Sequence, residues 1–308
     1  MLTESFRNAL ILTGPTGSGK TGTAVELAER LEAEIISIDS MAIYRGMDIG
    51  TAKPGPELRR RVPHHLLDVL DPWESGSVAW WLQQAATCAE EIQRRGRRVL
   101  FAGGTPMYLK ALLRGLFDGP PADLELRERL LREADMAGAR VLHERLSQVD
   151  PEAAARLHPN DRRRIIRALE VWHLTGKPLS SWQKEWARDC AEPSGTARVL
   201  CLELPRSELY ARIEARVEHM IAAGLVDEVR ALRRLPHPIS REARQALGYK
   251  ELFAHLDGQC SLDQAVAQIR TRSRNFAKRQ LTWFRHLPEC RLVTKELTFA
   301  AWGVTMDG

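Results

Sequence analysis

Long apolar runs, paired cysteines and internal repeats are all missing from this sequence of 308 residues. The longest apolar stretches, such as 9–13 and 99–102, are far shorter than the roughly 20 residues that a membrane helix needs. Its five cysteines are odd in number and scattered, with no CxxC pair, which argues against a disulfide framework or a zinc site. The absence of repeats and of low-complexity tracts excludes solenoids and disordered chains.

Composition and charge leave an ordinary globular protein with a preference for acidic partners. Hydrophobic residues make up 44% and charged residues 28%, as in typical globular domains. The net charge of +5 gives modest support to a polyanionic partner. The N-terminal apolar run leads into a glycine-rich turn, so it indicates a first strand and not a signal peptide. We expect a cytoplasmic protein with reduced thiols and no membrane partner.

Short apolar runs alternate with helical patterns over the first hundred residues. The runs lie at 10–13, 35–38, 66–70 and 99–102, and helices are expected at about 20–31 and 78–94. Such alternation is typical of an α/β fold with a parallel sheet.

The pattern changes after Gly115. No strand is indicated from about 118 to 193, where one arginine-rich helix has Asn160 or Asp161 as a possible N-cap and Gly176 as its end. A strand is expected again at 198–204, followed by helices to about 287. We therefore predict a core of residues 1–118 and 196–308, the latter with a C-terminal basic helix, interrupted by a helical insertion domain of residues 119–195.

A phosphate-binding loop follows the first predicted strand and opens the first predicted helix. The segment GPTGSGKT matches GxxxxGK[ST] in the structural context that the motif requires. Its backbone amides and helix N-terminus are suited to a diphosphate, with a lysine to neutralise it and a threonine to ligate Mg²⁺. The predicted diphosphate-binding residues are Gly14, Pro15, Thr16, Gly17, Ser18, Gly19, Lys20 and Thr21, and Thr21 is the metal ligand.

The loop alone does not identify the phosphorylated ligand. ATPases of this class have an aspartate after an apolar strand to orient magnesium. Here the strand 99–102 ends in Gly103-Gly104-Thr105, and Asp68 is a weaker candidate. The absence of an aspartate directly after this strand argues against ATP hydrolysis without excluding it. A P-loop kinase of small molecules therefore stays open as an alternative.

An ordered set of further motifs resembles the tRNA dimethylallyltransferases, or isopentenyltransferases, over nearly the whole chain. Besides the phosphate-binding loop, the blocks that carry the resemblance are 38–41 (IDSM), 44–54 (YRGMDIGTAKP), 63–65 (PHH), 103–105 (GGT), 158–161 (HPND), 248–250 (GYK) and 278–285 (KRQLTWFR). Met41 departs from the commonest residue of the family, and the zinc finger of eukaryotic relatives is missing. The resemblance is therefore to the bacterial type.

The resemblance implies a P-loop NTPase-like core whose loop holds dimethylallyl diphosphate instead of a nucleotide. It implies Mg²⁺ as cofactor, diphosphate as product, and an acceptor adenosine immediately 3′ of the anticodon, modified at its N6 amine. Asp39 then acts as the catalytic base, and Thr105 and Arg216 contact reacting groups.

The residues themselves support these roles unequally. Asp39 follows a predicted strand and lies near the phosphate-binding loop in a parallel sheet, where it is suited to take a proton from a weakly nucleophilic amine. The alternative is that Asp39 only caps a turn. Thr105 has a similar alternative as a turn or cap residue. Arg216 lies on an amphipathic helix, where exposure to solvent is the ordinary expectation, and only the resemblance places it in the site.

Two basic clusters are candidates for RNA binding. On the C-terminal helix, Arg270, Arg274, Lys278 and Arg285 share one face, and an apolar stripe of Ile269, Phe276, Trp283 and Leu287 is expected to pack. The alternative is a solvated basic face. Arg162–Arg164 and Arg167 form a second cluster in the insertion. The full set of predicted tRNA contacts is Asp39, Ser40, Met41, Ala42, Thr105, Arg127, Arg163, Arg164, Ile165, Ile166, Arg167, Gln245, Ala246, Leu247, Gly248, Tyr249, Lys250, Arg274, Lys278, Arg279, Gln280, Leu281, Thr282, Trp283, Phe284 and Arg285.

Three functions thus compete. A tRNA dimethylallyltransferase, acting as a monomer on the tRNA anticodon stem-loop, explains all the motifs. A P-loop kinase would use the same loop for ATP and leaves the basic helices unexplained. A non-catalytic RNA-binding protein would leave Asp39, Thr105 and Arg216 without a purpose.

Overall fold

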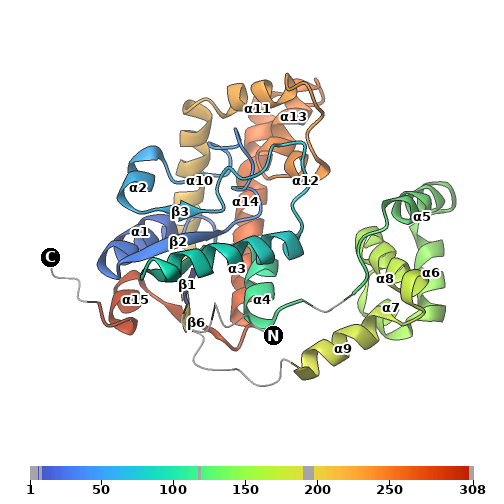
Figure 1. The fold of residues 1–308 in the computed structure, drawn as a ribbon. Helices are drawn as coiled ribbons and strands as arrows, with labels where there is room; N and C mark the ends of the chain where they lie inside the picture. Colours follow the sequence, from blue (N-terminus) through green and yellow to red (C-terminus); the bar gives the residue numbers. More distant parts are fainter. Residues whose placement is uncertain (1–5, 7–8, 117–118, 190–197, 305–308) are drawn as a thin grey trace. The chain divides into compact units, whose positions relative to one another are not determined.

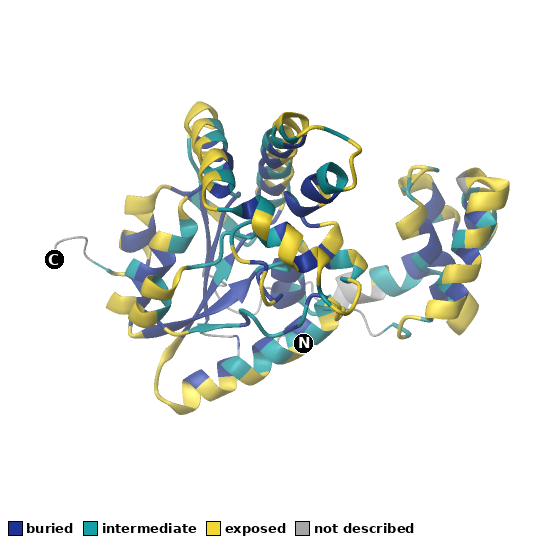
Figure 2. Ribbon diagram, turned by 90° about the horizontal axis from the view of Figure 1, so that it is seen from above, coloured by how far each residue is buried: buried dark blue, intermediate teal, exposed yellow. Residues whose placement is uncertain are grey.

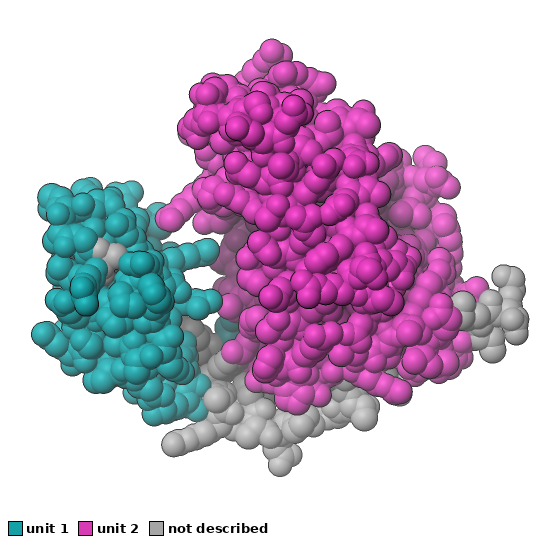
Figure 3. Space-filling model, turned by 180° about the vertical axis from the view of Figure 1, so that it is seen from behind, with its two compact units in different colours: residues 1, 115–193 teal, residues 2–114, 194–308 magenta. Residues whose placement is uncertain are grey.

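The computed structural model describes residues 6, 9–116, 119–189 and 198–304. The chain divides into two compact units, one of residues 115–193 and the other of residues 2–114 with 194–308 (Figure 3). The predicted boundary between 195 and 196 lies outside the described residues, as do residue 118 and Cys190.

The larger unit is built on a six-stranded parallel sheet, in agreement with the predicted α/β class (Figure 1). The strand order is β3-β2-β4-β1-β5-β6, so β1 and β4 lie side by side at the centre. Four strands occur where the apolar runs predicted them, and β6 was not predicted. The strands are β1 (Leu10–Thr13), β2 (Ala33–Ile38), β3 (His64–His65), β4 (Arg98–Gly103), β5 (Arg198–Leu202) and β6 (Cys290–Val293).

The predicted strand at 66–70 is wrong. Only His64 and His65 pair with β2, and the next residues turn away because Leu66 and Asp68 have φ of 60° and 56°. These left-handed conformations cannot continue a strand. Leu66 and Leu70 are buried all the same, so their apolar character serves packing in an irregular segment.

Helices cover both faces of the sheet, which is why its strands are apolar at nearly every position (Figure 2). Leu10 and Leu12 of β1 pack with Val25 of α1, whereas Ile11 belongs to the core cluster on the opposite face. The helices of this unit are α1 (Lys20–Arg30), α2 (Pro56–Arg61), α3 (Val78–Arg94), α4 (Pro106–Arg114), α10 (Arg206–Ala222), α11 (Leu225–Arg233), α12 (Arg241–Arg244), α13 (Tyr249–Leu256), α14 (Leu262–Arg285) and α15 (Lys295–Ala301).

Helices are the only regular secondary structure among the described residues of the smaller unit, which has its own core of leucine, isoleucine and alanine side chains. Asp161 is the N-cap of α8 and accepts a hydrogen bond from Arg164 N, and Gly176 ends the helix with φ of 67°. The predicted arginine-rich helix is therefore present, with Asp161 and not Asn160 as its cap. The helices are α5 (Leu124–Ala137), α6 (Ala139–Val149), α7 (Pro151–Arg156), α8 (Arg162–Thr175) and α9 (Leu179–Asp189).

A buried carboxylate holds α5 and α8 together. The side chain of Glu170 has no exposed surface and accepts two hydrogen bonds of 2.9 Å from the Arg127 guanidinium and one of 2.6 Å from Arg167. The Asp123 backbone N–H donates a further bond of 2.7 Å. Burial alone would raise the pKa of Glu170, but these donors outweigh it and lower the pKa below its ordinary value.

No described helix is both long and apolar enough to cross a lipid bilayer.

Replacement of Glu170 by Gln is expected to reduce the free energy of unfolding by about 3 kcal/mol, because it leaves two partly buried guanidinium groups without a counter-charge. The loss should be largest at neutral pH. It should shrink as the pH falls below about 4, where the unfolded carboxyl is protonated and the wild-type advantage fades. Urea unfolding followed by circular dichroism measures it, with the exposed Glu128→Gln on α5 as the matched control. Equal stability of the two variants would contradict the assigned role.

Candidate functional site

The phosphate-binding loop lies between the end of β1 and the start of α1. Gly17 and Gly19 both have φ of 85°, a conformation that other residues adopt with strain. A Cβ atom on Gly17 would also lie 2.9 Å from Ile213 Cγ1. Gly19 caps α1 without a side-chain hydrogen bond, so the first amides of the helix remain available to an anion.

Lys20 brings a partly buried positive charge to this loop. Its Nζ donates a hydrogen bond of 3.1 Å to the Pro15 carbonyl. Burial and, to a smaller extent, the nearby Arg216 lower the pKa of Lys20 to about 8, against the opposing effects of Asp39 and Cys201. A bound anion would stabilise the charged form, so the loop is prepared for a phosphate group.

Arg216 reaches the same place from α10, where the sequence pattern alone predicted exposure to solvent. Its Nη1 donates a hydrogen bond of 3.0 Å to Thr16 Oγ1. Leu209 and Ile213 are buried on the same helical face, seven and three residues before Arg216, and they direct it inward. Burial lowers the pKa of Arg216, and the Asp39 carboxylate opposes that shift.

Asp39 follows β2, and its two carboxylate oxygens have different surroundings. Oδ1 accepts hydrogen bonds from Met41 N at 2.8 Å and Ala42 N at 3.2 Å, which is the predicted turn cap. Oδ2 makes no hydrogen bond to any described residue. The cap fixes the orientation of the carboxylate and leaves one oxygen for a substrate.

The segment Gly103-Gly104-Thr105 closes the site from the end of β4. Gly104 N and Thr105 N both donate to the Ile38 carbonyl at 3.1 Å, and Thr105 Oγ1 accepts from Ser40 N at 3.1 Å. A Cβ atom on Gly104 would lie 3.0 Å from the Gly14 carbonyl oxygen. The end of β4 is therefore too close to the phosphate-binding loop for the aspartate that an ATPase carries there.

Asp68, the other candidate for a magnesium-orienting acid, is occupied. It pairs with Lys53 Nζ at 2.5 Å and with Arg59 Nη1 at 2.7 Å. Burial would raise the pKa of Asp68, but its two cationic partners lower it instead. This carboxylate therefore serves to hold its own loop.

Tyr108 is a site residue that the sequence did not reveal. On α4, its ring stacks on Trp81 with centroids 4.4 Å apart. Burial raises the pKa of Tyr108 above its ordinary value, with smaller contributions from the charges of Tyr44 and Asp39. Its only sequence signal is its position one helical turn after Thr105.

Glu228, also unforeseen, anchors the loop of residues 47–53. Its carboxylate accepts hydrogen bonds from the backbone N–H groups of Asp48, Ile49 and Gly50 at 2.9, 2.8 and 3.2 Å. The Tyr249 hydroxyl adds a fourth bond of 2.5 Å. Any side chain on Gly50 would strike the Tyr249 ring, at 2.4 Å from Cε2. The motifs 44–54 and 248–250 thus meet in space.

Several predicted RNA contacts have buried side chains. Ile269 and Leu287 of the predicted apolar stripe are buried, but Phe276 and Trp283 are only half-buried, and small or polar residues such as Ser273, Ala277 and Gln280 fill the packed face of α14 between them. Small side chains allow close helix contact but carry little apolar signal, which explains the error. The buried predicted contacts are Ala42, Ile165, Ile166, Ala246, Gly248, Tyr249, Gln280 and Phe284, and Met41, Leu247 and Leu281 are half-buried against apolar clusters.

The basic stripe of α14 is largely neutralised. Arg270 pairs with Glu218 at 3.0 Å, Arg274 with Glu214, and Arg285 with Glu203 at 2.5 Å. Lys278 and Arg279 are exposed and form no ion pair with a described residue.

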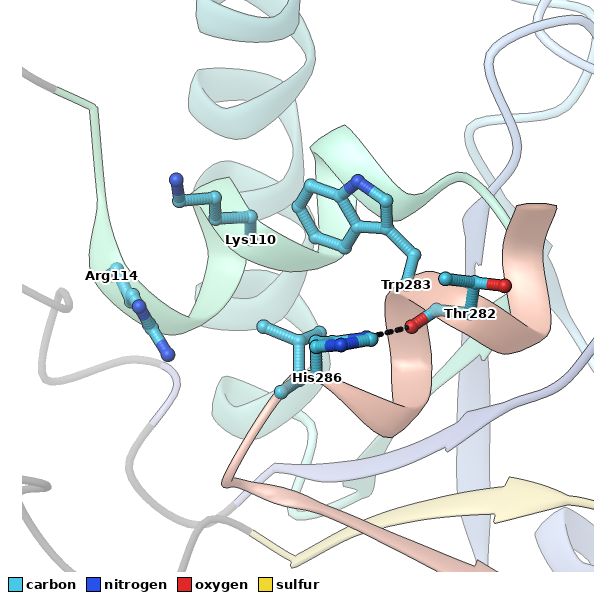
Figure 4. A pocket seen from close by; sticks show the side chains of 6 residues that line it. Lys110, Arg114, Thr282, Trp283 and His286 are labelled. Atoms are coloured by element: carbon cyan, nitrogen blue, oxygen red, sulfur yellow. Dashed lines mark hydrogen bonds between the residues drawn. The ribbon is translucent and has the colours of Figure 1, made fainter. Parts of the chain in front are cut away.

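The half-buried side chain of Trp283 lies at the edge of the packed face, where it lines a pocket of about 340 Å³ (Figure 4). Lys110 and Arg114 border this pocket from α4, and Arg114 is held by Glu289. His286 donates from Nδ1 to the Thr282 carbonyl at 2.6 Å. A second pocket, of about 410 Å³, shares Trp283 and is lined by Asn275, Lys278, Arg279 and Thr282. An indole beside cations suits an unstacked nucleobase and its phosphates.

In the helical unit, Arg163 and Arg164 are exposed, whereas Arg127 and Arg167 are bound to Glu170. Of the other predicted contacts, Ser40 is half-buried beside Thr105, and Gln245, Lys250 and Thr282 are exposed.

The described residues contain no group of three or more His, Cys, Asp or Glu side chains that could hold a metal ion. A cation would therefore need ligands from a bound phosphate as well. The Thr21 hydroxyl is the protein group that fits, since it makes no hydrogen bond to another described residue.

Comparisons with known proteins agree with this geometry. The IPP transferase family model matches residues 42–287 and the isopentenyl transferase model matches residues 7–62. The chain is 49% identical over 285 residues to the tRNA dimethylallyltransferase of Geobacter metallireducens, covering 92% of each protein. It is 48% identical over 290 residues to that of Geobacter sulfurreducens, covering 94% of the chain and 93% of the relative.

Solved structures agree as well. The tRNA isopentenylpyrophosphate transferase of Bacillus halodurans is 39% identical with a TM-score of 0.69, and 96% of each chain is covered. A eukaryotic dimethylallyltransferase, solved acting on tRNA, is 26% identical with a TM-score of 0.78, covering 96% of this chain and 77% of that one. The partly buried cations at the phosphate-binding loop, the Asp39 carboxylate and these similarities lead to one conclusion: the chain belongs to the IPP transferase family, that of the bacterial tRNA dimethylallyltransferases.

Proposed function

We propose that this protein transfers a dimethylallyl group from dimethylallyl diphosphate to an adenine amine of tRNA and releases diphosphate. The observation that carries the proposal is the arrangement around the phosphate-binding loop. Lys20 and Arg216 lie there as partly buried cations beside Asp39, and Gly104 fills the place of the ATPase aspartate. A kinase of small molecules would lack an acid to orient its magnesium and would leave the relatives' tRNA chemistry unexplained.

The protein groups that would bind the diphosphate of the donor are better defined than those that would bind the acceptor. Amides of the phosphate-binding loop and of the α1 N-terminus face it, and Lys20 and Arg216 supply positive charge. Negative charge grows on the diphosphate as the allylic carbon–oxygen bond breaks. Donors already aimed at that charge stabilise the transition state more than the ground state.

The acceptor half uses Asp39. The exocyclic amine attacks the allylic carbon, a carbon–nitrogen bond forms as the carbon–oxygen bond breaks, and one amine proton passes to Asp39 Oδ2. The amides of Met41 and Ala42 hold Oδ1 and so fix the direction of Oδ2. Thr105 and the protonated hydroxyl of Tyr108 complete the polar surroundings. The base must leave its stack to reach these groups.

Mg²⁺ is proposed as the cofactor, held by the Thr21 hydroxyl together with diphosphate oxygens. It would neutralise charge on the leaving group. The buried Ser18 Oγ, which has no hydrogen-bond partner in the described chain, is a further group that a bound diphosphate would satisfy.

The finer features of the substrate are also proposals. We infer that the acceptor is the N6 amine of the adenosine immediately 3′ of the anticodon, and that the anticodon stem-loop contacts Lys278, Arg279 and the pockets at Trp283. Arg163 and Arg164 would bind backbone phosphates. A monomer acting in the cytoplasm is sufficient for this chemistry.

Donor identity is tested by thermal shift. Dimethylallyl diphosphate with Mg²⁺ should raise the thermal midpoint more than ATP with Mg²⁺ at the same concentration, because stabilisation follows ln(1 + [L]/Kd). A ligand at 100 times its Kd stabilises by about 2.7 kcal/mol. A larger shift with ATP would favour the kinase alternative.

Asp39→Asn is expected to reduce the rate of transfer by a factor on the order of 10² to 10⁴ and to leave both substrates bound. Asn still accepts hydrogen bonds from the Met41 and Ala42 amides but does not take a proton. Single-turnover kinetics with saturating tRNA and donor measure this step. If the rate stays within about threefold of wild type, Asp39 is only a turn cap.

On α14, Lys278→Ala should weaken tRNA binding and reduce the slope of log K against log salt by about one, the value for one lost phosphate contact. Arg274→Ala is the matched comparison and should change the slope less, because Glu214 already neutralises that guanidinium. Filter binding from low to moderate salt gives both slopes. An unchanged slope for Lys278→Ala would mean that this face is merely solvated.

A further inference from the structure

Gln280 belongs to the basic segment of α14 but does not share its exposure. Only 3% of the residue is accessible to solvent. Its Oε1 accepts a hydrogen bond of 2.9 Å from Thr16 N, and its Nε2 donates one of 2.6 Å to the Gly104 carbonyl. One buried carboxamide thus joins α14 to the phosphate-binding loop and to the end of β4.

These contacts hold Thr16 from two sides. Gln280 binds its backbone N–H, while Arg216 binds its hydroxyl. The other end of the carboxamide meets Gly104, where an added Cβ would lie only 2.7 Å from Nε2. Gly104 in turn is followed by Thr105, so the two substrate-facing segments are fixed by the same side chain.

The helix separates Gln280 from its charged neighbours. At 100° per residue, Gln280 is about 160° from Lys278 around the helix axis, and it shares a face with Ser273, Ala277 and Phe284. Lys278 and Arg279 point outward, where RNA is proposed to bind. A basic segment that meets RNA on one side therefore meets the diphosphate loop on the other.

We propose that Gln280 is a positioning residue for the donor diphosphate, acting through Thr16 and Gly104, and not an RNA contact. This inference rests on the proposed function. The hydrogen bond to the carboxamide occupies the Thr16 N–H, which is then not available to the ligand. It also holds the loop in the conformation in which its other amides and Lys20 face the diphosphate. It also keeps Thr105 at a constant distance from the loop.

The test compares two substitutions on neighbouring residues. Gln280→Met keeps the length of the side chain and removes both hydrogen bonds, leaving a buried N–H and a buried carbonyl unpaired. We expect inorganic diphosphate with Mg²⁺ to bind at least tenfold more weakly, and tRNA to bind within about twofold of wild type. Lys278→Met should instead weaken the binding of tRNA and leave the binding of diphosphate close to that of the wild type. Isothermal titration of diphosphate and filter binding of tRNA measure the two affinities.

Gln280→Glu adds a readout that a purely structural role would not produce. A protonated glutamate offers one acceptor and one O–H donor, as the carboxamide does, whereas a carboxylate would face the Gly104 carbonyl oxygen. Burial raises the pKa of a carboxyl group. Diphosphate affinity relative to wild type should therefore recover as the pH falls from 8 to 6.

Each other outcome has a distinct meaning. Loss of tRNA affinity with normal diphosphate binding in Gln280→Met would make Gln280 an RNA contact and overturn the inference. If Gln280→Met lowers the thermal midpoint and binds neither ligand, the Gln280→Glu variant decides between the two roles. A diphosphate affinity of Gln280→Glu, relative to wild type, that does not change with pH would then overturn the inference. Wild-type protein that binds ATP but not diphosphate would instead refute the proposed function.

Discussion

The site depends on the partial burial of two cations, Lys20 and Arg216, beside a single carboxylate, Asp39. Removal from water lowers the pKa of both cations, and one carboxylate offsets this only in part. An excess of buried positive charge is unfavourable in the free protein and becomes favourable when a diphosphate enters. The sheet makes the arrangement possible, because the phosphate-binding loop and Asp39 follow the carboxyl ends of parallel strands.

Close approach of backbone segments is the second constraint. The end of β4 lies against the phosphate-binding loop only because Gly104 has no side chain, and Gly103 in the same way allows close approach to the Ile38 backbone. The same contact removes the room for a magnesium-orienting aspartate and creates the hydrogen bond from Gln280 to Gly104. The departure from the ATPase pattern is thus a packing requirement as much as a chemical choice.

Ion pairs neutralise more of the positive surface charge than the composition suggests. Arginines on α8 and α14 are paired with Glu170, Glu214 and Glu218, and these pairs orient side chains that would otherwise be disordered in solvent. An oriented guanidinium loses less conformational entropy when it meets a ligand, but its net charge is reduced. Cations without an ion pair to a described residue, such as Lys278 and Arg279, then supply the electrostatic attraction for RNA.

The sequence by itself determined the features that are local in the chain. The phosphate-binding loop, the strand β1, the helix α3 and the cap and end of α8 at Asp161 and Gly176 all depend on residues within a few positions of one another, so propensity and spacing suffice. Only the tertiary structure decided the features that depend on distant partners. Arg216 is directed toward the phosphate-binding loop because α10 packs on that loop, and Tyr249 and Gln280 face inward because Gly50 and Gly104 leave room for them. Such partners are separated by up to 264 residues, and hydrophobic periodicity along one helix carries no information about which polar side chain will find a buried partner on another segment.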